Sequence, residues 1–274
     1  VEYSGDDLVN TITGQIVPRQ DTELKNASLQ MGYQLNRRWQ VNGRYGWEWN
    51  DFQTFNDANT GGAAWDMGVR WTPSARTTVG LGMGDRFFGQ TPRVNISHER
   101  GRNTFTASYN KAITFANDIR TQQDLLNPDF INNPTLNTAS PILDERFIVG
   151  WSYAGRRAAL DFSGNHSQQT EADTGEKSIF QSWAVSVSPL ISSTYTLSGA
   201  LAWNDYEPRS EFGIPSSQFD EETSQAWITS VNVGRVINSR MNLNVGYQYT
   251  LQESDQSFNE YQENRVVATL NISL

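Results

Sequence analysis

The feature that most constrains this chain is an alternation of apolar and polar residues with a period of two. Between Met241 and Leu251 every odd-numbered residue is apolar or aromatic, and the even-numbered residues are Asn, Gly, Gln and Thr. Successive side chains of a β-strand point to opposite faces of the sheet, whereas those of an α-helix repeat about every 3.6 residues. The segment is therefore predicted to be a β-strand with one apolar face and one polar face.

The same alternation recurs along the chain and predicts a series of strands. They are expected near residues 24–35, 39–50, 63–72, 77–88, 92–100, 104–115, 144–154, 158–169, 179–188, 194–206, 223–234, 241–253 and 262–274. A further strand is expected within residues 1–17, where Leu8, Ile12 and Ile16 show a weaker spacing. Because bacterial single-chain barrels have an even number of strands, the total is expected to be about 14, within a range of 12–16.

Strand length separates a membrane barrel from a soluble β-sandwich. Sandwich strands are usually about 5–6 residues long and their cores favour aliphatic residues. Strands of about ten residues that end in Trp or Tyr match a tilted strand that crosses a bilayer. The prediction is an all-β fold, a transmembrane antiparallel up-and-down β-barrel, with residues 1–274 as a single outer-membrane β-barrel domain.

Eleven aromatic residues fall on the predicted apolar faces and are expected to lie at the lipid interface. They are Trp39, Trp47, Trp49, Trp65, Trp71, Trp151, Trp183, Trp203, Trp227, Tyr247 and Tyr249. Trp and Tyr have an apolar ring and a polar atom, so they form girdles where lipid meets water.

The connections between the predicted strands alternate between short and long. Short turns are expected at 36–38, 72–76, 100–103, 154–157, 188–193 and 235–240, and five of these six carry Arg. Longer connections are expected at about 51–62, 116–143, 170–178, 207–222 and 254–261, and they are rich in Asp and Glu. Outer-membrane barrels have short periplasmic turns and long extracellular loops. The expected location is thus the bacterial outer membrane, with acidic extracellular loops, and the expected partners are membrane lipid and lipopolysaccharide.

Ten charged residues fall on the predicted polar faces and are expected to line the lumen. They are Arg44, Glu48, Asp66, Arg70, Arg86, Arg93, Glu99, Arg146, Asp161 and Arg265. Two roles remain open for them, namely ion pairs that stiffen the wall and a mixed-charge lining that screens solutes in a channel. The connection 116–143 is long enough to fold into the mouth and narrow it.

The sequence shows no sign of catalysis, of a cofactor or of a metal site. The chain has no Cys, and its net charge of −9 argues against a nucleic-acid partner. Gly80, Gly82 and Gly84 alternate with apolar residues and fit a strand better than a nucleotide-binding loop. Of the two histidines, His166 is followed directly by Ser167, which a strand would place on the opposite face. We therefore expect no enzyme activity, no cofactor and no bound metal.

Three stretches resemble the PEP-CTERM system-associated outer membrane protein family. They are LNRRWQVNGRYGWEWNDFQ (35–53), GVRWTPSARTTVGLGMGDRFFG (68–89) and ISHERGRNTFTASYNKAITFAND (96–118). The shared features are Arg-containing turns, a W-T-P-S-x-R-T turn and an R-F-F-G exit, and the resemblance covers about residues 24–120. It implies an outer-membrane barrel associated with the production or export of exopolysaccharide.

Two functions follow as hypotheses. The first is a porin-like channel linked to exopolysaccharide export or secretion, with a polysaccharide or a small solute in the lumen. The second is an occluded barrel that anchors a larger envelope assembly through a periplasmic or envelope-complex partner.

Overall fold

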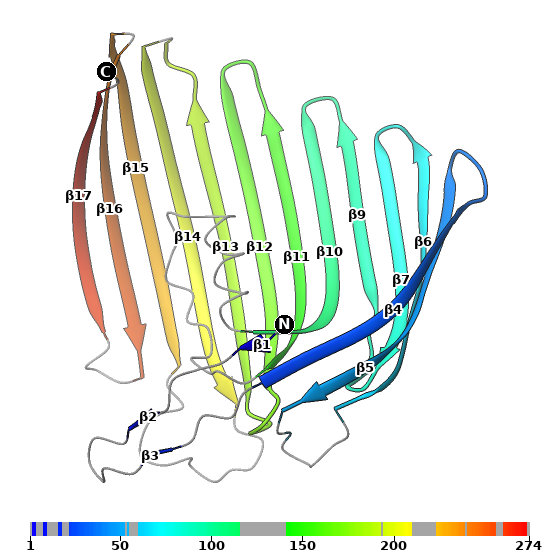
Figure 1. The fold of residues 1–274 in the computed structure, drawn as a ribbon. Helices are drawn as coiled ribbons and strands as arrows, with labels where there is room; N and C mark the ends of the chain where they lie inside the picture. Colours follow the sequence, from blue (N-terminus) through cyan, green and yellow to red (C-terminus); the bar gives the residue numbers. More distant parts are fainter. Residues whose placement is uncertain are drawn as a thin grey trace.

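The computed structural model describes residues 2–3, 8–9, 16–17, 22–52, 54, 60–115, 141–192, 194–209, 223–238, 240–255 and 260–272. Within these ranges the structure is entirely β (Figure 1). The described residues contain no helix long and apolar enough to cross a membrane.

Thirteen of the described strands have eight or more residues. They are β4 (Thr22–Gln34), β5 (Trp39–Asp51), β6 (Gly62–Ser74), β7 (Thr77–Arg86), β9 (Arg93–Arg100), β10 (Asn103–Thr114), β11 (Ile142–Ala154), β12 (Ala158–Glu171), β13 (Lys177–Pro189), β14 (Tyr195–Arg209), β15 (Ser224–Asn238), β16 (Met241–Ser254) and β17 (Tyr261–Ile272). Each overlaps a strand expected from the alternation. A strand of 13 residues such as β5 is roughly 43 Å long, because each residue adds about 3.3 Å. When tilted by about 45°, such a strand crosses the roughly 30 Å of a bilayer core.

The strands form one antiparallel up-and-down sheet. Its order is β1 (Glu2–Tyr3)-β4-β5-β6-β7-β9-β10-β11-β12-β13-β14-β15-β16-β17, so the thirteen long strands follow one another in the sheet as they do in the chain. Figure 1 shows the sheet curving from β17 at one edge to β4 and β5, which cross obliquely at the other. Its path has 14 strands, as expected, and the antiparallel up-and-down order is that of a β-barrel wall. Among the described residues β4 and β17 do not pair, so the sheet is open between them.

The expected strand within residues 1–17 is reduced to a short pairing. β1 (Glu2–Tyr3) pairs antiparallel with the first residues of β4. β2 (Leu8–Val9) and β3 (Ile16–Val17) pair with each other in a separate two-stranded sheet. The prediction that Leu8 and Ile16 share one spanning strand was therefore wrong. The alternation is weak here, and it does not distinguish one strand from two short strands that pair with each other.

Side chains in the short turns accept hydrogen bonds from backbone amides and so stabilise the turns, where the chain reverses direction. The Asn36 side chain accepts from the amides of Arg38 and Trp39 at 2.8 and 3.1 Å. Ser192 does the same for Thr194 and Tyr195 at 3.2 and 3.0 Å. Asn and Ser form such local bonds readily, which is why they favour turns over strand interiors.

One connection is shorter than expected. β12 and β13 continue past the predicted strand ends, and only residues 172–176 connect them in place of a loop over 170–178. The amide of Glu171 donates to the carbonyl of Glu176 at 2.9 Å, and Gly175 has a φ of +74°. Glycine adopts that left-handed conformation without the steric cost of a Cβ. The acidic and polar residues at the ends of these strands gave no alternation signal, although the strands continue through them.

A short additional strand, β8 (Gly89–Gln90), pairs with the end of β7. β9 continues this pairing with β7 in the same register, starting at Arg93 opposite Gly82. Pro92 lies between the two strands, and proline has no amide hydrogen to donate to a ladder. The break between β8 and β9 is therefore local.

The two faces of the sheet differ in chemistry. One face, here the apolar face, carries large exposed hydrophobic residues on strands across the sheet, for example Met31, Met67 and Val231. The other, here the polar face, carries Asn, Ser, Thr, Gln, Gly and charged residues. Strand register places all eleven predicted interface aromatics on the apolar face.

Some of these aromatics cluster near strand ends and others do not. Trp39 and Trp71 stack with ring centroids 5.5 Å apart next to the turn at 36–38. Trp47 and Trp49 lie toward the opposite end of β5. Trp183 is closer to the middle of β13, and its ring packs edge-on against the ring of Trp227.

Candidate functional site

The polar face encloses a cavity of about 600 Å³ beside β4–β10. Asn26, Ser28 and Gln30 on β4 line it, together with Gln40 and Asn42 on β5. These side chains offer amide and hydroxyl groups, which both donate and accept hydrogen bonds. The cavity is therefore suited to water and to hydrogen-bonding solutes.

The structure brings six of the ten predicted lumen residues to this cavity. They are Arg44, Glu48, Asp66, Arg70, Arg86 and Arg93. The alternation placed each of them on the polar face of its own strand. Their meeting depends on the pairing of β5, β6, β7 and β9 side by side.

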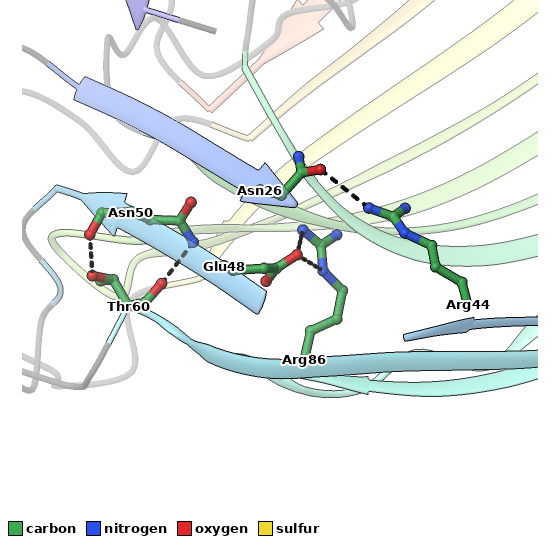
Figure 2. A network of polar contacts seen from close by, with 6 residues as sticks. All are labelled: Asn26, Arg44, Glu48, Asn50, Thr60 and Arg86. Carbon is green, nitrogen blue, oxygen red and sulfur yellow. Dashed lines mark hydrogen bonds and ion pairs between the residues drawn. The ribbon is translucent and has the colours of Figure 1, made fainter. Parts of the chain in front are cut away.

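Glu48 and Arg86 form the most buried ion pair of the cavity (Figure 2). Arg86 Nη2 lies 2.5 Å from Glu48 Oε1, and Arg86 Nε donates to the same oxygen at 2.8 Å. The Glu48 side chain is 3% exposed, and its second oxygen, Oε2, has no hydrogen-bond partner among the described residues. Arg86 also lies over the ring of Phe88, with Cζ 5.0 Å from the ring centroid. A buried carboxylate needs such a partner, because an unpaired buried charge is costly.

Asp66 and Arg93 form a second ion pair that crosses β7. Arg93 Nη2 donates to Asp66 Oδ1 at 2.8 Å. Its guanidinium group passes over Gly82, where a Cβ atom would lie only 2.9 Å from Nη2. Glycine at this position gives the arginine room to lie flat against the wall.

Arg44 and Arg70 also line the cavity but have no carboxylate partner among the described residues. Arg44 Nη2 donates to the neutral Oδ1 of Asn26 at 3.3 Å (Figure 2). No hydrogen bond or ion pair of the Arg70 side chain is seen among the described residues. Both residues are exposed.

The four other predicted lumen residues lie on the polar face away from this cavity. Arg146 pairs with Asp144 at 3.0 Å, and both side chains are 9% exposed. Glu99 is exposed near the β9–β10 turn, Asp161 is exposed on β12, and Arg265 is exposed on the edge strand β17.

Several polar-face residues at one end of β11–β16 are buried, whereas Asp161 and Asn232, further along the same face, are exposed. Ile142, Gln169, Ile228 and Thr250 are each at most 2% exposed. Sequence reasoning did not select Asp144, which also accepts a hydrogen bond from Ser167 Oγ at 2.5 Å. A signal was present, since Asp144 and Arg146 are two residues apart and so share a face.

The two histidines lie on the apolar face, apart from the cavity. His98 Nδ1 is 2.9 Å from the hydroxyl of Thr77. His166 pairs across the sheet with Phe147 and Gln181, while Ser167 faces the other way. Within the described residues no group of three or more His, Cys, Asp or Glu could hold a metal ion.

The expected constriction by the connection 116–143 falls mostly outside the described residues. The structure describes Phe115 and resumes at Pro141.

No protein-family model matches the chain, and no curated protein matches it. Among solved structures, it is similar to OmpTdeltaL8, a loop L8 deletion mutant of OmpT, an outer membrane protein of Vibrio cholerae, with 9% identity, coverage of 92% of each chain and a TM-score of 0.46. It is also similar to an anion-selective porin from Comamonas acidovorans, with 8% identity, coverage of 90% of this chain and 87% of that chain, and a TM-score of 0.43. A third likeness is to Salmonella typhi OmpF in complex with daunomycin, with 10% identity, coverage of 94% and 93%, and a TM-score of 0.43.

Proposed function

We propose that this chain forms a porin-like channel in the bacterial outer membrane, with the polar face of the sheet as the wall of the pore. The observation that carries the proposal is the cavity lined by charged and polar side chains on one face of the sheet. The other face of the same sheet exposes large hydrophobic side chains. Fourteen strands lie between the roughly eight whose interior is filled by side chains and the 16–18 that leave an aqueous channel. A narrow pore is the expected result.

The finer parts of the proposal concern orientation, cargo and partners. The short Arg-bearing turns face the periplasm and the long connections face outward, in contact with lipopolysaccharide. The resemblance of residues 24–120 supports a link to the export or secretion of exopolysaccharide, with a periplasmic or envelope partner. We expect no hydrolase activity of the His–Ser kind, since His166 and Ser167 lie on opposite faces of β12.

The buried polar-face residues at one end of β11–β16 favour a second candidate, an occluded barrel that anchors an envelope assembly. If side chains fill the lumen beside these strands, solutes cannot pass. Both candidates have the same wall and differ only in whether a continuous water path exists.

Conductance decides between them. The purified full chain, refolded in detergent and added to a planar lipid bilayer, should give discrete conductance steps in 1 M KCl. Vesicles that contain it should also release no fatty acid from their phospholipids. A bilayer that stays silent, although the protein is folded and inserted, would contradict the channel and leave the anchoring role.

A further inference from the structure

The cavity beside β4–β10 has a surplus of positive charge, although the chain as a whole carries −9. Four arginines and two carboxylates from the polar face line it. Lys111 also borders the cavity, but its ammonium group pairs at 2.6 Å with Glu145, and both residues belong to the apolar face. The polar-face side chains therefore leave two positive charges uncompensated.

The surplus belongs to two specific residues. Glu48 is paired with Arg86, and Asp66 is paired with Arg93, so each carboxylate has its own arginine. Arg44 and Arg70 remain, and both are exposed to the cavity. Arginine keeps its charge at any physiological pH, so the surplus is permanent.

The positions of Arg44 and Arg70 allow one solute to contact both. Arg44 lies opposite Asp66, and Arg70 lies four residues further along the same strand. Four residues correspond to roughly 13 Å along a strand, a separation that two long arginine side chains can narrow. Asn26, Gln40 and Asn42 line the space around them with amide groups.

We propose that Arg44 and Arg70 form a binding site for a small carboxylated polyol within the channel. A guanidinium group binds a carboxylate through two parallel charge-assisted hydrogen bonds, while the amides bind hydroxyl groups. The cavity of about 600 Å³ has the size of an ordinary small-molecule site. This inference rests on the proposed channel for its biological role, but binding can be measured without conduction.

The binding test uses the full chain refolded in detergent and titrated with glucuronate, with glucose as the neutral control. Glucuronate should bind saturably and glucose should not. Arg44→Gln and Arg70→Gln should each weaken glucuronate binding by about tenfold or more, because each removes a charge-assisted contact. Arg265→Gln is the matched control. It removes the same charge from the same face but lies outside the cavity, so it should leave affinity unchanged.

A second measurement separates this inference from the proposed channel. In a bilayer with a KCl gradient, the reversal potential should show a preference for anions, and Arg44→Gln/Arg70→Gln should reduce that preference. Glucuronate binding with a silent bilayer would retain the site and reject the channel. Conductance without saturable glucuronate binding would retain the channel and overturn the site. Equal weakening by all three variants, each checked for folding by circular dichroism, would also overturn it.

Discussion

At the scale of single residues, two arginines of the polar face form ion pairs with carboxylates and two do not. Arg86 contacts Glu48 across β6, and Arg93 contacts Asp66 across β7. Neither contact joins residues directly opposite each other on adjacent strands. The long side chain of arginine and the curvature of the sheet make these pairs possible, and they leave Arg44 and Arg70 exposed to the cavity.

Alternation in the sequence could place these residues on one face but could not show which ones pair. It identifies Glu48 as a polar-face residue because Trp47 and Trp49 flank it. It identifies Arg86 because this residue continues the even-numbered positions that alternate with Val79, Leu81 and Met83. The contact between Glu48 and Arg86 depends on how β5, β6 and β7 are aligned with one another. Such contacts also need space above the intervening strand, which Gly82 provides for Arg93. That information is three-dimensional and has no signature within one strand.

The Glu48–Arg86 pair leads to a stability prediction. Arg86→Gln should lower the free energy of unfolding by about 1–3 kcal/mol, because it leaves the buried Glu48 carboxylate without its partner. Urea unfolding in detergent, followed by Trp fluorescence, measures the change. The double variant Glu48→Gln/Arg86→Gln should recover most of the loss, since it also removes the buried charge. If the double variant is as unstable as the single one, the pairing does not explain the loss.

At the level of elements, each strand separates two environments. On β15, Val231 is exposed on the apolar face, whereas Asn232 is exposed on the polar face. Both residues lie near the middle of a strand of 15 residues. Adjacent positions of one strand should therefore respond in opposite ways to the same substitution.

Arginine at these two positions tests the assignment of the faces. Val231→Arg would place a charge in lipid near the bilayer midplane and should cost about 2–4 kcal/mol of folding free energy. Asn232→Arg, on the exposed polar face, should cost much less. Refolding equilibria into phospholipid vesicles provide the measurement. Equal costs at the two sites would show that the faces are not lipid and water.

The strands were predictable to within a few residues where both faces keep their chemistry, as in β16. Prediction was wrong at 170–178, where β12 and β13 continue through polar residues that give no alternation. It was also wrong at Leu8 and Ile16, because a spacing of apolar residues does not specify the partner strand. Periodicity reports the environment of a strand, and its length and pairing depend on its neighbours.

For the whole molecule, the turns that follow β4, β6, β9 and β11 lie at one end of the sheet, and the connection between β12 and β13 lies at the other (Figure 1). Ser74 is exposed next to a short turn, and Thr174 is exposed in the connection between β12 and β13. The chain has no Cys of its own, so single introduced cysteines report their positions without interference.

Labelling of intact cells tests the orientation. Thr174→Cys should react with a membrane-impermeant thiol reagent, whereas Ser74→Cys should react only after the outer membrane is opened. The open membrane serves as the control that both cysteines are reactive. Strong labelling of Ser74→Cys alone on intact cells would reverse the orientation.

The open sheet has a directional consequence. Strand direction reverses at each step, so the first and last of thirteen long strands, β4 and β17, run the same way. In a second copy with the same orientation in the membrane, the edge strands β4 and β17 would run in that direction too. Edge strands of two such copies could therefore pair only in parallel. Within a membrane, unpaired backbone groups at such an edge are costly. An antiparallel ladder along either edge therefore requires a strand of opposite direction. Of the described strands at the free margin of β4, β1 has that direction.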